Sequence, residues 1–122
     1  MDLPVLTGLS LKEWKAKDPE ARALLHQALD LLDLLERKKG FSLKDVSEVH
    51  MSKKDGLTLY TLDGGIPIRV GRGELEDKLN RLEKVMPDLR NKLKDVEYLL
   101  LDYQRRVVVK MKDSGREKAR KS

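Results

Sequence analysis

The sequence predicts an α+β domain with a mostly antiparallel sheet, a long helix near the N-terminus and a kinked helix before the last strand. Three observations support this prediction. Apolar residues recur at helical spacing between Asp18 and Gly40. Apolar and polar residues then alternate in three short segments between Asp45 and Val70, which the turn sequences KKDG and LDGG separate. Helical spacing returns from Glu74 onward. A helix, hairpin-linked strands and a second helix in this order are typical of α+β domains.

The N-terminal part predicts an extended segment followed by the long helix. In LPVLTGLS, Pro4 and Gly8 interrupt any regular pattern, so this segment is expected to lie extended on the core. Asp18 is a suitable N-cap and Pro19 fits the first helical position, while Gly40 provides the stop. The apolar face of this helix is expected to consist of Ala21, Leu24, Leu25, Ala28, Leu32 and Leu35.

Three strands are predicted next, in DVSEVHMS (45–52), GLTLYTL (56–62) and IPIRV (66–70). Each is short, rich in β-branched or apolar residues and bounded by turn residues. Pro67 has no amide hydrogen to donate. The third strand is therefore expected at an edge of the sheet, or with Pro67 at a position that makes no ladder bond.

The second helix and the last strand complete the predicted fold. The apolar stripe of the helix consists of Leu75, Leu79, Leu82, Met86, Leu89 and Leu93. Pro87 interrupts this stripe, which predicts a kink or a division of the helix into two. The segment VEYLLLDYQRRVVVKMK (96–112) is predicted to form one long strand, since it is apolar and β-branched through its centre. Its place near the chain end favours an edge strand, which either repels or captures other strands. The alternative is a central strand of the sheet with a charged face toward solvent.

The segment GGIPIRVGRGELEDKL (64–79) has the strand, glycine and helix order of phosphate-binding loops. Three carboxylates in the first helical turn, however, would repel an anion. The dinucleotide-binding and P-loop patterns are also incomplete. We therefore interpret the segment as a corner between sheet and helix. The glycines that permit positive φ in its two turns are Gly64, Gly65, Gly71 and Gly73.

Catalytic and metal-binding patterns are not apparent. The chain has no cysteine, which excludes disulfides and thiolate zinc sites, and its two histidines, His26 and His50, lack a nearby set of further ligands. No Ser/His/Asp set is brought together by the sequence itself. From its residues alone, the sequence therefore gives no catalytic set, no cofactor site and no metal site to name.

Positive charge is concentrated at the C-terminal end. Eight basic and two acidic residues lie between Gln104 and Ser122, whereas the other 103 residues carry 18 basic and 19 acidic ones. Residues 113–122 lack periodicity and are expected to be a disordered basic tail after a domain of residues 1–112. An alternative function is therefore nucleic-acid binding through the C-terminal Arg/Lys segment. That segment lacks interleaved aromatic residues apart from Tyr103, so it offers no stacking platform.

Four segments in this order resemble a known family: LPVLTGLS, the long helix, LYTLDGGIPIRVGRGELEDKLNRLEKVMPDL and VEYLLLDYQRRVVVKMK. Together they are similar to the C-terminal extracytoplasmic β domain of the bacterial cell-division proteins FtsQ/DivIB. The resemblance runs from about Leu3 to Lys112, and the order and spacing of the segments carry it rather than any single motif. The most specific part is a strand with a Gly-Gly turn, a second strand that ends in VGRG, and a helix with RL, V, P and L at the family's spacing.

The resemblance implies that the chain is a fragment of a single-pass inner-membrane protein, without the membrane span and the POTRA domain that precede this domain in the family. It implies a periplasmic, non-catalytic scaffold of the divisome that supports septation. The implied partners are FtsB-like and FtsL-like division proteins, bound by β-augmentation at the last strands of the sheet, and no specific nucleic acid.

The family pattern can be transferred to a few positions only. Tyr103 matches the family's tyrosine in the final strands, and Val107, Val108 and Val109 match the terminal apolar strand. Leu100 and Asp102 stand where the family has aspartate and arginine, and Arg105 and Arg106 lie where the family's glycine turn usually falls. The expected partner-binding residues are therefore Tyr103, Arg105, Arg106, Val107, Val108 and Val109.

Overall fold

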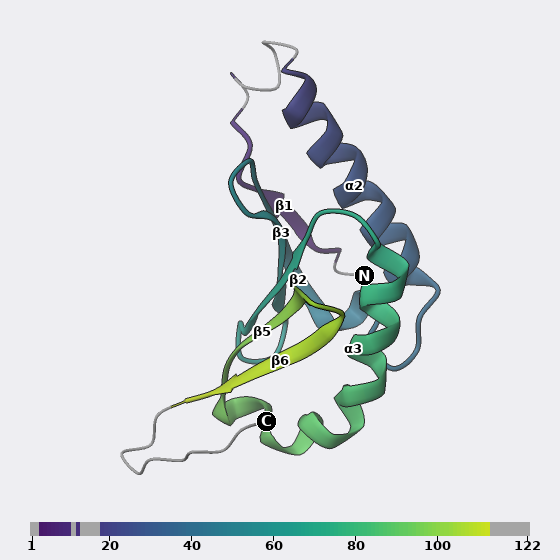
Figure 1. The fold of residues 1–122 in the computed structure, drawn as a ribbon, viewed down its shortest axis with the longest axis vertical. Coiled ribbons are helices and arrows are strands. Elements are labelled where there is room, and N and C mark those ends of the chain that lie inside the picture. The colour runs from purple at the N-terminus through teal and green to yellow at the C-terminus, as the bar shows by residue number, and fades with distance from the viewer. Residues whose placement is uncertain (1–2, 11, 13–17, 113–122) are drawn as a thin grey trace.

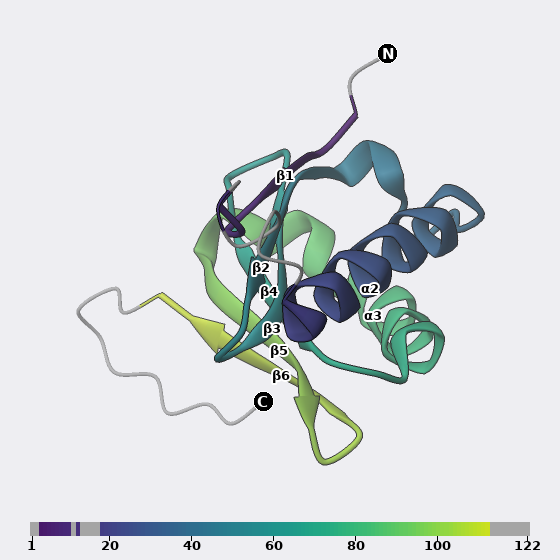
Figure 2. The ribbon, with the colours of Figure 1, turned by 90° about the horizontal axis from the view of Figure 1, so that it is seen from above.

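The computed structural model describes residues 3–10, 12 and 18–112, and it places two helices on one face of a sheet (Figures 1 and 2). The helices are α2 (Pro19–Glu36) and α3 (Leu75–Leu89). Helix α2 packs against strands β2 and β3, while α3 packs against β5 and β6. The strands in chain order are β1 (Val5–Thr7), β2 (Val46–Ser52), β3 (Gly56–Thr61), β4 (Pro67–Gly71), β5 (Val96–Tyr103) and β6 (Arg106–Met111).

The sheet has its six strands in sequence order, from β1 at one end to β6 at the other. The pairs β2/β3, β3/β4 and β5/β6 are antiparallel, while β1/β2 and β4/β5 are parallel. The prediction of an α+β domain with a mostly antiparallel sheet is confirmed. Two features differ from it: the N-terminal segment forms strand β1, and the sheet is mixed because α3 carries the chain from β4 to a parallel β5.

Helix α2 begins where the sequence predicts. The Asp18 carboxylate accepts a hydrogen bond from the amide of Glu20 at 3.0 Å, and Pro19 occupies the first helical position. The helix ends at Glu36, before Gly40, and Arg37 is its C-cap. Its buried face includes Leu31, which was not predicted. The residues buried on this face are Ala21, Leu24, Ala28, Leu31 and Leu35, while Leu25 and Leu32 are only partly buried.

Helix α3 passes through Pro87 and ends two residues later, at Leu89. The chain continues as a 3-10 helix, Arg90–Asp95, which has a non-helical residue at Lys92. Since proline cannot donate to the carbonyl four residues earlier, the regular α-helical ladder weakens at this point. The α-helix nevertheless continues past Pro87, so it is not divided there, and the change to 3-10 geometry follows three residues later, at Arg90.

The prediction that residues 96–112 form one long strand is wrong. Strand β5 ends at Tyr103, and the chain reverses through a two-residue turn into β6, which begins at Arg106. Both turn residues have positive φ, 44° at Gln104 and 57° at Arg105, as in a type I′ hairpin. Such turns are usually signalled by Asn-Gly, and a Gln-Arg pair gives no such signal.

Two further expectations concern the turns and the third strand. Positive φ is found at Gly64, Gly65, Gly71 and Gly73, which confirms the predicted corners. Strand β4 is not at an edge, because it lies between β3 and β5. Pro67 is the first residue of that strand, where a missing amide is tolerated. The predicted basic tail, residues 113–122, lies outside the described residues.

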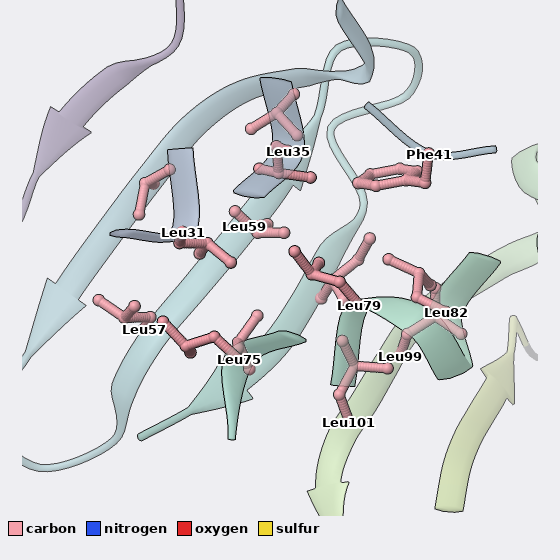
Figure 3. Packing of buried hydrophobic residues seen from close by; sticks show 14 of the residues in the cluster. Leu31, Leu35, Phe41, Leu57, Leu59, Leu75, Leu79, Leu82, Leu99 and Leu101 are labelled. Atoms are coloured by element: carbon pink, nitrogen blue, oxygen red, sulfur yellow. The ribbon is translucent and has the colours of Figure 1, made fainter. Parts of the chain in front are cut away.

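The hydrophobic core fills the space between the helices and the sheet (Figure 3). Leucines from both helices meet leucines of β3 and β5 there, and Phe41 closes the end of the core after α2. Fully buried large side chains in this layer are Leu24, Leu31, Leu35, Phe41, Leu57, Leu59, Ile68, Leu79, Leu82, Met86, Leu99 and Leu101. This layer covers one sheet face only, so the other face of the sheet carries no helix of the described chain (Figure 2).

Candidate interaction site at the β6 edge

Strand β6 lies at the end of the sheet and pairs with β5 alone. Leu99 lies opposite Val109, Leu100 opposite Val108, and Tyr98 opposite Lys110. The other long side of β6 has no neighbouring strand in the described part of the chain (Figure 1). A strand in this position presents backbone amides and carbonyls that another strand can bind.

The side chains of β6 alternate between the two faces of the sheet. Val107, Val109 and Met111 are partly buried and pack against the hydrophobic core on the helix side. Val108 points to the opposite face, where its strand neighbour is Leu100. Arg106 and Lys110 are exposed on that same face. The edge strand is thus apolar in its middle and basic at two positions near its ends.

A row of side chains crosses the helix-free face from the centre of the sheet to this edge. The strand pairings align Thr58 with Arg69, Arg69 with Leu100, and Leu100 with Val108. Leu100 and Val108 are half-buried although no helix covers them. The apolar middle of β6 therefore continues inward onto the helix-free face, next to the cation of Arg69.

All six predicted partner-binding residues lie on the β5–β6 hairpin. Tyr103 ends β5, is 50% exposed and pairs with Arg106 across the turn. Arg105 is in the turn itself, so the predicted location of the family's glycine turn at 105–106 is displaced by one residue toward Gln104. In the described part of the chain, neither Arg105 nor Arg106 forms an ion pair.

A buried lysine supports the junction between β4 and α3, close to this hairpin. Lys78 Nζ donates hydrogen bonds to the carbonyl oxygens of Val70 at 2.7 Å and Arg72 at 3.0 Å. Burial lowers the pKa of Lys78, and the nearby negative charge of Asp102 opposes that shift. Asp102 also lies over Gly71, where an added Cβ would be 2.7 Å from its Oδ2 atom. The carboxylate of Asp102 thus faces the β4–α3 corner. Lys78 was not identified from the sequence.

The opposite edge of the sheet is short. Strand β1 spans three residues, and Thr7 Oγ1 donates to Glu48 Oε2 at 2.5 Å and lies 2.9 Å from His50 Nδ1. These contacts connect β1 to β2. The longer stretch of unpaired backbone is therefore on β6, which spans six residues.

The rest of the described surface shows no constellation typical of an active site. The described residues include no group of three or more His, Cys, Asp or Glu side chains placed to hold a metal ion. A hollow of about 420 Å³ lies between α2 and the start of α3, with Asp30, Asp33, Glu74 and Glu76 among its lining residues. Arg37 pairs with Asp33 at its rim, at 2.5 Å. In the described part of the chain, no helix combines the length and apolar character that crossing a bilayer requires.

Comparisons with known proteins agree with this architecture. The family model for the C-terminal region of cell division protein FtsQ/DivIB matches residues 1–103. The chain is 37% identical over 115 residues to cell division protein FtsQ of Syntrophotalea carbinolica, covering 94% of this chain and 40% of that protein. It is 39% identical over 111 residues to cell division protein FtsQ of Geobacter sp. strain M21, again covering 40% of that protein. The chain therefore spans about two fifths of the length of these relatives.

Proposed function

Because the chain belongs to the FtsQ/DivIB family of cell division proteins, in the C-terminal region of that family, we propose that it is a non-catalytic scaffold domain of the divisome. It binds partner division proteins of the FtsB and FtsL type through the edge of β6, by β-augmentation, and thereby supports septum formation. The proposed binding residues are those of the hairpin: Tyr103, Arg105, Arg106, Val107, Val108 and Val109.

The observation that carries this proposal is the long side of β6 with which no strand of the described residues pairs. Six residues of extended backbone end the sheet, and their middle is three valines rather than the charges or prolines that usually protect an edge. Strand addition gains affinity from main-chain hydrogen bonds and specificity from alternate side chains. Strand β6 offers both main-chain hydrogen-bonding groups and alternating side chains.

The location follows from the same family relationship. We propose that the complete protein is anchored in the inner membrane by a single span, with this domain on the periplasmic side. A domain tethered beside a membrane meets partners that are tethered in the same membrane at a high effective concentration, so moderate affinity at one edge strand suffices.

The decisive experiment is a titration of the ¹⁵N-labelled chain with the extracytoplasmic part of an FtsB-like partner, followed by amide chemical shifts. We expect saturable shifts from Tyr103 to Met111. Because successive amides of a strand point in opposite directions, Val107→Pro and Val108→Pro remove amides on opposite sides of β6. One of the two proline variants is expected to keep the amide spectrum of a folded domain. That variant is expected to have lost partner binding.

Val108→Ala is the matched control, since it shortens the side chain and keeps the amide. We expect it to weaken binding only modestly. Binding that survives both proline variants with the fold intact would exclude β6 as the docking strand.

Nucleic-acid binding is the alternative, and the basic side chains without ion pairs in the described residues are what favours it. A site that neutralises several phosphates loses binding steeply between low and moderate salt. Strand addition supported by apolar contacts does not. Measuring affinity for a short oligonucleotide and for the FtsB-like partner at about 50 and 200 mM salt separates the two.

A further inference from the structure

The five residues from Arg106 to Lys110 read basic, apolar, apolar, apolar, basic. The two faces of the sheet divide these five residues into two sets. Arg106, Val108 and Lys110 share the helix-free face, while Val107 and Val109 share the face that packs against the core. Any strand that adds to β6 brings its own side chains next to these two sets.

The two cations at the ends of this stretch have no acidic residue directly opposite them on β5. Neither Arg106 nor Lys110 forms an ion pair in the described part of the chain. The residue opposite Lys110 on β5 is Tyr98, and the residue opposite Arg106 is Tyr103, so the strand pairing supplies no carboxylate to either. Asp102, the acidic residue of β5 that is nearest to Arg106 in the sequence, lies over Gly71.

The same two cations disfavour pairing between copies of this chain. If two β6 strands paired antiparallel around Val108, Arg106 of each copy would face Lys110 of the other. Like charges directly opposite each other destabilise a strand pair. The edge therefore discriminates against a second copy while it leaves three central valines for a partner of the opposite charge.

We propose that β6 selects an extended partner segment with the complementary order acidic, apolar, apolar, apolar, acidic. This inference rests on the proposed function and specifies the chemistry of its partner. Acidic residues face Arg106 and Lys110, a central apolar residue extends the Leu100–Val108 row, and the two flanking apolar residues continue the core side beside Val107 and Val109. Since the order is the same from either end, parallel and antiparallel addition both satisfy it.

Two labelled peptides test this inference, one with the core Glu-Val-Ile-Val-Glu and one with Lys-Val-Ile-Val-Lys, each flanked by threonines. They share length and β propensity and differ only in the sign of two charges. With two cross-strand pairs changing from attractive to repulsive, we expect the acidic peptide to bind about tenfold more tightly at low salt. The preference should shrink as salt rises, because the charges are exposed. Fluorescence anisotropy with the 122-residue chain measures both.

The doubly reversed variant, Arg106→Glu with Lys110→Glu, identifies the residues responsible. We expect it to prefer the lysine peptide by a similar factor while its amide spectrum outside the hairpin stays unchanged. A reversal at Arg22 and Lys84, which are exposed on the two helices and outside β6, should leave the preference for the acidic peptide in place.

The outcomes distinguish a wrong partner pattern from a failure of strand addition itself. Equal binding of both peptides, or an unchanged preference in the doubly reversed variant, overturns the inferred partner pattern and leaves strand addition standing. If neither peptide binds although the FtsB-like partner does so through β6, the pattern is also wrong. If neither the peptides nor the partner binds, the proposed function itself fails.

Discussion

Lys78 Nζ lies 2.7 Å from the carbonyl oxygen of Val70 and donates a hydrogen bond to it from a side chain that is 6% exposed. A second bond reaches the carbonyl of Arg72. These two acceptors are in the segment where the chain leaves β4 and turns toward α3. A buried ammonium thus holds the corner from which both α3 and the parallel strand β5 follow.

Replacing Lys78 by methionine should lower the free energy of unfolding by about 1–3 kcal/mol, because the carbonyls of Val70 and Arg72 lose their donor. Urea denaturation measures this change. Lys84→Met, at an exposed position of the same helix, should stay within about 0.5 kcal/mol of the parent. Equal effects of the two substitutions would show that the buried hydrogen bonds contribute nothing to stability.

The stability difference between the parent and Lys78→Met should also depend on pH. Burial lowers the pKa of Lys78 in the folded state below its usual 10.5, so the unfolded chain binds the proton more readily between these two values. Stability from this group therefore rises as pH increases through that window. The difference in stability between the parent and Lys78→Met should widen as the pH rises toward 10.5, and a constant difference would contradict the lowered pKa.

Glu83 connects α3 to the segment after α2. Its Oε2 atom accepts hydrogen bonds from the amides of Gly40 at 2.8 Å and Lys39 at 3.2 Å. The bond from Gly40 is the main reason that the pKa of Glu83 lies below its usual 4.5. Stability from this carboxylate is present above pH 4.5 and is lost as pH falls through the folded-state pKa.

Glu83→Gln should therefore lower the free energy of unfolding by about 1 kcal/mol at pH 7, and the deficit should close toward pH 3. Thermal unfolding across this pH range measures it. Asp88→Asn, an exposed neutral replacement on the same helix, should show no such pH-dependent gap. A deficit that persists unchanged at pH 3 would assign the effect to packing instead.

Substitutions at two glycines can distinguish a steric clash between neighbouring strands from the cost of a left-handed backbone conformation. Gly56 and Gly73 have similar positive φ, 82° and 71°. A Cβ added at Gly56 would lie 2.6 Å from the backbone carbon of Gly71, whereas one added at Gly73 meets nothing within 4 Å. Gly73→Ala should cost about 1 kcal/mol for the left-handed conformation alone, and Gly56→Ala should cost clearly more. Equal losses in chemical denaturation would contradict the close approach of β3 and β4.

Local signals in the sequence predicted the parts of the fold that depend on neighbouring residues. Asp18 and Pro19 mark the start of α2, and KKDG marks the β2–β3 hairpin, because caps and turns are built from adjacent side chains. The parallel pairing of β4 with β5 could not be read in this way. It depends on where α3 returns the chain, which is a property of packing rather than of any one segment.

At the candidate site, too, the sequence predicted some features and missed those that depend on tertiary packing. The place of residues 96–112 near the chain end predicted an edge strand, and the second half of this segment, β6, is at the edge. Lys78 was missed because a lysine between leucines resembles an ordinary solvent-facing helix position, and only the tertiary structure places carbonyl oxygens around it. The hairpin turn was missed because neither Gln104 nor Arg105 is a residue that turns with positive φ normally require.

That turn provides the last prediction. Gln104 and Arg105 both occupy the left-handed region, which costs a residue with a side chain about 1 kcal/mol relative to glycine. The double substitution Gln104→Asn with Arg105→Gly supplies the preferred type I′ pair and should raise the free energy of unfolding by about 1 kcal/mol. Arg106→Gly is the matched control, because a glycine inside β6 should destabilise. Since the Asn-Gly turn keeps the β5–β6 register, strand addition to β6 should persist in the double variant, weakened only by the loss of the Arg105 side chain. Loss of stability in that variant would show that the chain does not reverse at Gln104 and Arg105.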